Sequence, residues 1–429
     1  MLLFSVTVSK RLQYICKFIF EEQWGMAFTL TTDSQKFAEH SGPKINYSNI
    51  DMGAQVFTIS NHSLLFQQNR VAQPIECFDF MGTKAFFKTE ANSHFGFDVL
   101  AASFYLLSRY EEYLPHQKDS YGRFAHENSL AFKEGFLHQP IINQWLKLFA
   151  AAVQKHFPAI VITTPAFRFL PTYDIDIAWS YRHKGLLRNL GGFFKKPDVK
   201  RWLVLLGLQP DPFDCYDYLH QLHSRFGLQP VYFFLVAASR SQYDKNISPY
   251  AHAQWQLMKR HAKKYRTGLH PSWQSNFNAK LIAKEKKILE TATAMQINRS
   301  RQHYIKMELP QTYRRLLAAG ITHDYSMGYG SINGFRASVA SPFYWYNLEE
   351  ETATSLIIHP FCFMDANAFY EQKQDAAQSL LELMQYYREC KNVNGELITI
   401  FHNSFLGTDP LYSGWKEMYE QFLENLLIS

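Results

Sequence analysis

The sequence predicts an α/β protein, a (β/α) barrel of about seven units, complete or distorted, preceded by a small α/β domain. Two observations predict this fold. From about residue 165 onward, apolar strand-like runs alternate with helical segments, the order typical of a parallel sheet with helical crossovers. Polar residues also gather where strand-like runs end, as they do at the active-site face of such barrels. These residues are Asp174, Asp176, His270, His359 and His402.

Length and composition favour a folded protein of more than one domain. The chain has 429 residues, of which 47% are hydrophobic and 19% are charged. This balance argues against disorder, and the length allows two or three domains with their own cores. We expect residues 1–160 to form an N-terminal α/β domain of unknown role and residues 161–429 to form the barrel.

Charge and cysteine content exclude several classes of partner. The net charge of +6 is mild for this length, and no long basic run carries interleaved aromatics, so nucleic acid is not implied. No stretch approaches the ~20 apolar residues of a membrane span. The five cysteines form no CxxC pair, which is typical of a reducing compartment. The oligomeric state stays open.

The N-terminal apolar run is short. It covers about eight residues, is followed by Lys10 and Arg11, and has no small-residue cleavage site. We therefore expect a buried strand leading into a helix rather than a signal peptide. The expected location is cytoplasmic.

The N-terminal third predicts short strands and two longer helices. The spacing of apolar residues gives a helix over 97–113, with Pro115 just beyond it, and a second helix over 141–155. Strands are expected over 26–31, 44–47 and 55–59. No catalytic constellation is visible in this part of the chain.

The remaining two-thirds predict the units of the barrel. The first strand covers 167–177 and carries the two acids, and the run 231–236 is apolar throughout, as in strands buried on both faces. Further strands are expected over 267–269, 321–324, 355–358 and 397–401. Helices are expected over 214–226, 249–264, 279–295, 310–319, 375–390 and 414–427.

Asp174 and Asp176 suggest chemistry through their spacing. In an extended chain, side chains at i and i+2 point to the same face. Two ionised carboxylates that share a partly dry pocket have an unfavourable free energy, and a cation between them would stabilise both charges. One carboxylate would bind the cation, and the other would take a proton from a water.

Several segments together resemble the polysaccharide deacetylase (NodB-homology) family. The segment 172–176 resembles its first motif, and Gly268 to Ser272 resembles its second. The similarity covers roughly residues 165–425, with all motifs in the family's order. The other matching segments are 301–304, 324–326 with 334–336, and 398–402. The N-terminal part resembles an uncharacterised domain that precedes such deacetylases in some bacterial proteins.

The resemblance implies a metal-dependent hydrolase that removes N-acetyl or O-acetyl groups from glycans. Asp174 would be the general base, and Asp176 and His270 would be metal ligands. Arg301 would hold the ionised base in place, and His402 would be the acid that protonates the leaving amine. Zinc is the first choice of metal, with nickel, cobalt or manganese as alternatives for an N/O site.

Two departures from the family pattern leave alternatives open. The family has a second metal histidine four residues after the first, where this chain has Gln274. His303 or Asp174 would then complete the metal site. Ile175 separates the two acids, so the roles of base and ligand are open to exchange between them.

Substrate contacts are expected from three residues. Tyr304 would lie near the oxyanion, and Trp273 and His359 would bind the substrate; Asp365 is a further candidate for the pocket lining. The main hypothesis is a deacetylase acting on an acetylated saccharide. The alternative is a catalytically silent member that binds a glycan or a partner through the same pocket. A third hypothesis is hydrolysis of another small amide on the same barrel.

Overall fold

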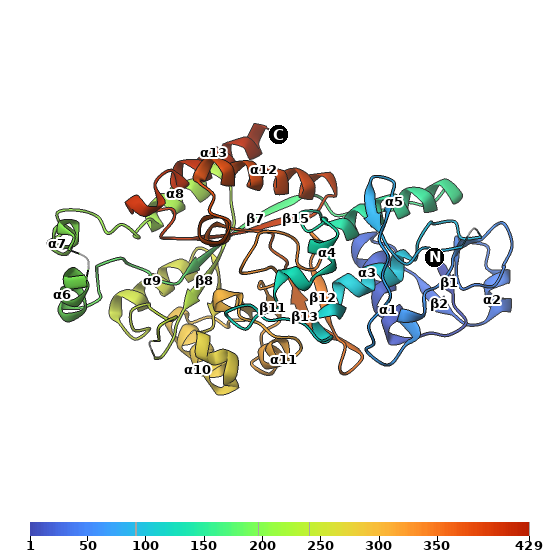
Figure 1. Cartoon of the computed structure of the whole chain (residues 1–429), viewed down its shortest axis with the longest axis horizontal. Coiled ribbons are helices and arrows are strands. Elements are labelled where there is room, and N and C mark those ends of the chain that lie inside the picture. The colour runs from blue at the N-terminus through green and yellow to red at the C-terminus, as the bar shows by residue number, and fades with distance from the viewer. Residues whose placement is uncertain (91, 196, 240, 429) are drawn as a thin grey trace. The chain divides into compact units, whose positions relative to one another are not determined.

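The computed structural model describes residues 1–90, 92–195, 197–239 and 241–428 in two compact units (Figure 1). Unit 1 contains residues 1–168, 334–360 and 388–396, and unit 2 contains residues 169–333, 361–387 and 397–429. The expected boundary near residue 160 stays a prediction; the first crossover between the units lies at Arg168. Unit 1 differs from the expected domain because it also contains two later segments of the chain.

Unit 1 is built on a parallel sheet with the strand order β2-β1-β3-β4. The expected strand over 44–47 is confirmed as β3, and the expected helix over 141–155 as α5. The expected helix over 97–113 is wrong in its second half, because Arg109 has a positive φ of 53° and a 3-10 turn, Tyr110–Tyr113, follows. The elements are β1 Leu2–Phe4, α1 Lys10–Cys16, β2 Thr29–Thr31, α2 Ser34–Glu39, β3 Lys44–Tyr47, β4 Phe57–Ile59, β5 Phe78–Phe80, β6 Thr83–Ala85, α3 Val99–Leu107, α4 Leu130–Lys133, α5 Ile141–His156, β12 Phe343–Asn347 and β13 Thr352–Ile358.

A buried ionic cluster joins the early and late segments of unit 1. Glu112 accepts hydrogen bonds from Arg336 Nη2 at 2.6 Å and from Arg109 Nε at 2.7 Å. All three side chains are almost completely buried. Burial alone would raise the pKa of Glu112, but the two guanidinium groups outweigh it and lower the pKa to about 2. The ionised carboxylate of Glu112 therefore links this residue to Arg336, which lies 224 positions later in the sequence.

Unit 2 is built on seven neighbouring strands in the order β11-β10-β9-β8-β7-β15-β14, among the residues that the structure describes. Neighbouring pairs from β7 through β11 are parallel, and so is the pair β14 and β15. The mixed α/β architecture is confirmed, and closure of the sheet into a barrel stays a prediction. The strands are β7 Arg168–Ile175, β8 Val231–Leu235, β9 Arg266–His270, β10 Arg299–Ser300, β11 His323–Asp324, β14 Phe363–Met364 and β15 Glu396–His402.

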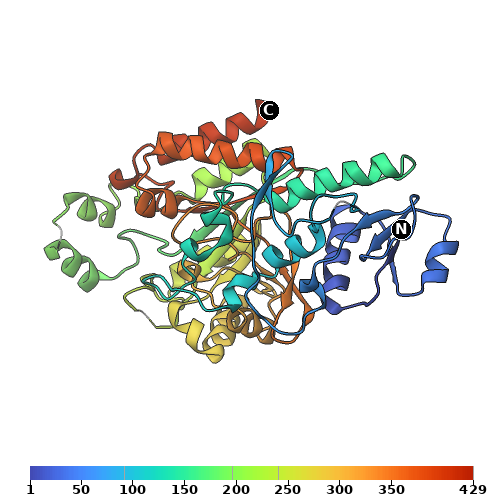
Figure 2. The same ribbon diagram turned by 45° about the vertical axis from the view of Figure 1, so that its right-hand side comes forward.

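Helices follow most strands of unit 2 (Figures 1 and 2). Each helix expected from the sequence is present within a few residues of its predicted bounds. Two further helices, α6 and α7, lie between β7 and α8 and were not predicted. The helices are α6 Leu186–Lys195, α7 Val199–Leu205, α8 Tyr216–Phe226, α9 His252–Ala262, α10 Ala279–Thr293, α11 Gln311–Ala318, α12 Ala376–Asn392 and α13 Trp415–Ile428.

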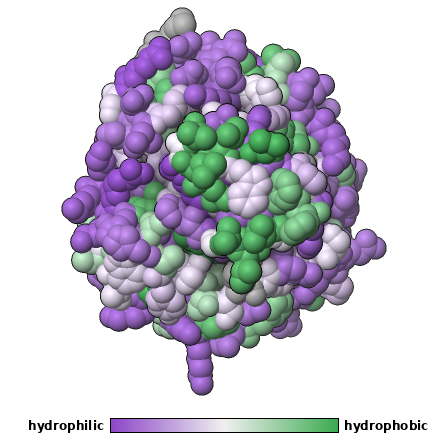
Figure 3. All heavy atoms as spheres, turned by 90° about the vertical axis from the view of Figure 1, so that its left-hand side faces the viewer, coloured by the Kyte–Doolittle hydropathy of each residue, from purple (hydrophilic) through white to green (hydrophobic). Residues whose placement is uncertain are grey.

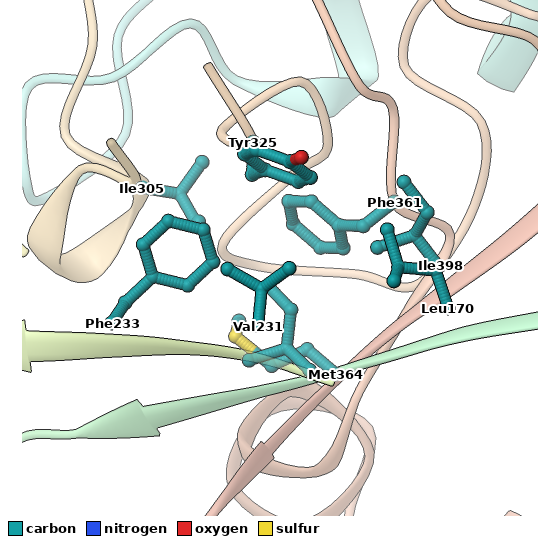
Figure 4. Packing of buried hydrophobic residues seen from close by; sticks show 9 residues of the cluster. Leu170, Val231, Phe233, Ile305, Tyr325, Phe361, Met364 and Ile398 are labelled. Carbon is teal, nitrogen blue, oxygen red and sulfur yellow. The ribbon is translucent and has the colours of Figure 1, made fainter. Parts of the chain in front are cut away.

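A cluster of buried apolar residues fills one face of this sheet (Figure 4). Leu170 on β7 belongs to it, and because side chains alternate along a strand, Thr172 and Asp174 lie on the same face. The alternation of side chains along β7 therefore places the carboxylates at its end on the face that buries Leu170. The cluster comprises Leu170, Val231, Phe233, Ile305, Tyr325, Phe361, Met364, Ile398 and Ile400.

In the described part of the chain, the helices are too short or too polar to cross a membrane.

Candidate metal and catalytic site

The candidate site lies where the parallel strands of unit 2 end. Asp174 and Asp176 stand at the end of β7, and His270 and His402 are the last residues of β9 and β15. The segment after β10 adds two further residues, Arg301 and His303. Parallel strands bring their carboxyl ends to one edge, so residues more than 200 positions apart meet there.

Three side chains could hold a metal ion together. His270 Nε2 lies 3.0 Å from Asp176 Oδ1, and His303 Nε2 lies 3.4 Å from Asp176 Oδ2. The potential ligand atoms of the three residues all lie within 4.8 Å of one another. Two imidazoles and one carboxylate form a set typical of zinc and of other divalent transition metals.

The hydrogen bonds on the far side of each ring orient both imidazoles. His270 Nδ1 donates to the carbonyl oxygen of Arg301 at 2.6 Å, and His303 Nδ1 donates to Asp244 Oδ1 at 3.0 Å. In the neutral rings this leaves the Nε2 lone pairs turned toward Asp176. Asp176 Oδ1 is itself buried without a hydrogen-bond partner. Lone pairs and a carboxylate repel one another unless a proton or a cation lies between them, so these residues fit a divalent ion.

The electrostatics of the site also favour positive charge. Burial alone would raise the pKa of Asp176, but the charge of His303 and the close approach of the His270 and His303 rings hold it well below its usual range. Burial would lower the pKa of His303, but the carboxylates of Asp176 and Asp244 outweigh burial and raise it to about 9. A site that draws protons onto an imidazole this strongly attracts a metal cation for the same reason.

The second carboxylate of β7 has a different environment. Asp174 Oδ1 accepts a hydrogen bond from Arg301 Nη1 at 2.8 Å, and its Oδ2 lies 3.9 Å from His270 Nε2. Arg301 is completely buried, donates through Nε to the carbonyl of Tyr325, and stacks on the ring of Phe233 at 4.4 Å. The guanidinium therefore fixes the position of the Asp174 carboxylate.

His402 approaches Asp176 from β15, which neighbours β7 on the side away from β8 and β9. Its Nε2 lies 3.5 Å from Asp176 Oδ2, and its Nδ1 donates to the buried carboxylate of Asp365 at 2.6 Å. The Asp365 carboxylate also accepts the backbone N–H of His402. Burial would lower the pKa of His402, but Asp365 and Asp176 raise it to about 10. His402 is thus protonated at neutral pH in this arrangement and can donate a proton.

The aromatic residues beside His303 form a small wall. The rings of Trp273 and Tyr243 stack with centroids 4.0 Å apart, and Tyr304 contacts both rings edge-on. Tyr304 has a positive φ of 59°, a strained conformation for a non-glycine residue that is often found at functional sites. The structure thus places the predicted substrate-binding residues Trp273 and Tyr304 next to the candidate metal ligands.

Two sequence expectations are placed elsewhere. His359 belongs to unit 1, where its Nδ1 lies 3.7 Å from the Glu396 carboxylate, so it is not one of the residues that unit 2 gathers at the site. Its strand, β13, pairs antiparallel with β12. Gln274 is exposed, and His303 takes the place expected for a third ligand.

Sequence reasoning missed Asp244. This residue is fully buried, and besides His303 it accepts the backbone N–H of Trp273 at 2.9 Å and the hydroxyl of Ser241 at 2.8 Å. Its position in the loop after β8 was the available signal, since the other site residues also follow strand ends.

Residues 1–158 match the model of a family of unknown function (DUF7033). None of the curated proteins matches this chain.

Solved structures similar to the chain include polysaccharide deacetylases. A protein assigned to that activity from Mycobacterium smegmatis is 12% identical, with a TM-score of 0.41, over 61% of this chain and 84% of its own. The polysaccharide deacetylase of Bacillus cereus is 8% identical, with a TM-score of 0.30, over 61% of this chain and 88% of its own. A CE4 family pseudoenzyme of Bacillus anthracis is 10% identical, with a TM-score of 0.28, over 62% and 68%. The chain is thus similar to deacetylases and to a pseudoenzyme, and the function proposed below rests on the site geometry.

Proposed function

We propose that unit 2 is a divalent-metal-dependent hydrolase that removes acetyl groups from an N-acetylated or O-acetylated saccharide. The observation that carries the proposal is that side chains suited to three different chemical roles surround Asp176. Two oriented imidazoles face this carboxylate on one side, and a protonated His402 and an arginine-fixed Asp174 stand beside it. Acyl transfer to water needs these parts, namely a cation site, a base and an acid.

Asp176, His270 and His303 would hold the ion, with zinc as the first choice. When bound, a divalent ion supplies Lewis-acid polarisation of the acetyl carbonyl and lowers the pKa of water at the site. The buried carboxylate of Asp244 would support the ion indirectly by keeping the His303 ring in its orientation.

The protein groups would divide the proton transfers. Asp174 would accept the proton of the attacking water, and Arg301 would hold this carboxylate in position. His402, charged through Asp365, would give its proton to the leaving nitrogen or oxygen of the sugar. Trp273 and Tyr304 would form the aromatic part of the substrate pocket next to His303.

A screen for acetate release tests the proposal. The purified chain is incubated with a panel of N-acetylated and O-acetylated oligosaccharides, with each of zinc, nickel, cobalt and manganese. We expect acetate from at least one substrate. The variant Asp174→Asn should lose turnover by ~100-fold or more while it keeps its metal. The absence of acetate with every metal and substrate would contradict the proposal.

Metal content separates an enzyme from a silent binding protein. Protein purified without chelator should carry close to one ion per chain, and Asp176→Ala should lose it. A chain that binds saccharides but carries no metal in either form would favour the catalytically silent alternative, which the Gln274 departure motivated.

A further inference from the structure

The segment between β7 and α8 presents a large exposed apolar surface. We name residues 182–208, which include α6 and α7, the α6–α7 segment. Six of its large apolar side chains are between 65% and 86% exposed, although side chains of this size are normally covered in a soluble domain. The space-filling view shows apolar side chains gathered on this face of unit 2 (Figure 3). The six residues are Leu186, Leu187, Phe194, Val199, Leu206 and Leu208.

Two of the exposed residues on α6 lie on one side of the helix. The exposed Leu186 and Phe194 and the half-buried Leu190 between them are four residues apart. In an ordinary amphipathic helix such a stripe faces the core. Here Leu186 and Phe194 are 65% and 80% exposed instead.

The segment is nevertheless built as a defined structure. The buried carboxylate of Asp211 closes its base by accepting the backbone N–H groups of Ser180, Tyr181 and Arg182 at 2.7, 2.8 and 2.9 Å. The two helices contact each other through the rings of Phe193 and Trp202, whose centroids are 5.7 Å apart. The exposed apolar residues thus belong to a segment that is fixed by hydrogen bonds at its start and by a ring contact between its two helices.

The segment also carries the net charge of the whole chain. Seven of the 44 Lys and Arg residues and one of the 38 Asp and Glu residues lie between positions 182 and 208, which leaves 37 of each sign elsewhere. The segment is therefore as positive as the entire protein, at +6. Lys195 and Lys200 are exposed beside the apolar residues.

We propose that the α6–α7 segment docks on the surface of an anionic lipid bilayer. Exposed Leu and Phe side chains beside Lys and Arg are the combination that binds the interface of anionic membranes, where apolar burial and charge attraction add. A second copy of this chain fits less well, because a twofold contact would place two strongly positive segments against each other. This proposal does not depend on the proposed hydrolase activity.

Vesicle flotation tests the proposal. The full chain is mixed with vesicles of phosphatidylcholine alone or with about 30% phosphatidylglycerol. We expect at least ~10-fold stronger binding to the anionic vesicles, and a loss of this preference near ~1 M salt. The combined variant Leu187→Ser, Phe194→Ser, Leu206→Ser should bind at least ~10-fold less, because its apolar contact is reduced. The variant Lys195→Gln, Lys200→Gln should lose part of the preference for phosphatidylglycerol.

Matched variants make the outcome specific. Leu381→Ser removes an equally exposed leucine from α12 and should float like the wild type, as should Asp176→Asn. Equal flotation of the wild type and the triple serine variant, or no flotation of the wild type, would overturn the proposal. It would also be overturned if the wild type dimerised without vesicles and the triple variant were monomeric, since a second copy would then cover this face.

Discussion

Asp174 and Asp176 illustrate how two neighbouring carboxylates acquire different chemistry. The side chain of Asp174 is fixed by Arg301, whereas Asp176 faces three imidazoles. The sequence left their roles open to exchange. The geometry favours Asp174 as the base and Asp176 as the ligand, because the guanidinium occupies one oxygen of Asp174 and holds it in place.

Asp244 should control metal affinity without contacting the metal. The variant Asp244→Asn removes the charge that holds the Nδ1 proton of His303, so we expect a ~10–100-fold weaker affinity for zinc. Competition with a chromophoric chelator measures this. Asp217→Asn, at an 89% exposed side chain of unit 2, should leave the affinity unchanged. Equal affinities of Asp244→Asn and the wild type would show that Asp244 does not support the site.

Gln274 offers a direct test of where the third ligand lies. Because its side chain is exposed and His303 faces Asp176, the variant Gln274→His should bind zinc as the wild type does. A ~10-fold gain in affinity in the same competition assay would contradict this and return the third position to residue 274.

At this scale, the sequence could predict residues whose chemistry is visible in their type and position. Asp176, His270 and His303 were all candidates for the metal site. Asp244 has a weaker signal, its position in the loop after β8, because its contact with His303 joins residues 59 positions apart. The expected role of His359 in the pocket stays a prediction, because this residue belongs to unit 1.

The elements of unit 2 position the site through close packing between strands. Gly268 in β9 has no side chain where the ring of Phe233 lies, and that ring in turn supports the guanidinium of Arg301. An added Cβ would meet Phe233 Cε1 at 2.5 Å and Arg299 Cβ at 3.1 Å. The glycine thus allows the close approach that places Arg301.

Gly268→Ala should therefore destabilise the protein by ~1–3 kcal/mol, because the overpacked ring has to move. Urea unfolding followed by circular dichroism measures the change. Gly191→Ala is the matched control, because its added Cβ would meet nothing within 4 Å, and it should be neutral or stabilising by up to ~1 kcal/mol. An unchanged stability of Gly268→Ala would mean that the packing around Phe233 adapts freely.

Sequence periodicity predicted most elements because their apolar residues face a core. The buried run 231–236 became β8, and the amphipathic run 141–155 became α5. Helices α6 and α7 were not predicted, because several of their apolar residues are exposed and because Gly191 and Gly192 interrupt the helical composition. The expected helix over 97–113 was broken by the left-handed backbone of Arg109, which no local composition indicates.

At the scale of the whole molecule, the domain division follows contacts that the sequence does not show. Unit 1 takes in residues 334–360, and Arg336 from that segment pairs with Glu112 in its buried cluster. A domain boundary predicted from composition alone does not show that a later segment of the chain belongs to the first unit. The contact depends on charges 224 positions apart.

Glu112→Gln should destabilise the protein by ~3 kcal/mol at pH 7, as expected for a pKa lowered from 4.5 to about 2. Since the folded pKa lies below the unfolded one, the ionised carboxylate stabilises the fold above pH 4.5. This contribution is lost as the pH falls from 4.5 toward 2. The difference between wild type and variant, measured by urea unfolding across this range, should therefore shrink.

A surface variant provides the comparison. Glu127→Gln, at a 61% exposed side chain, should change stability by less than ~0.5 kcal/mol at any of these pH values. A difference between Glu112→Gln and wild type that stayed constant with pH would show that charge is not what the cluster contributes.

Anomalous diffraction at the zinc edge, from a crystal grown with zinc, tests the central claim most directly. The account predicts one peak in unit 2, about 2.0–2.2 Å from Nε2 of His270, Nε2 of His303 and a carboxylate oxygen of Asp176. A crystal with no peak there, or with zinc bound by other residues, would contradict it.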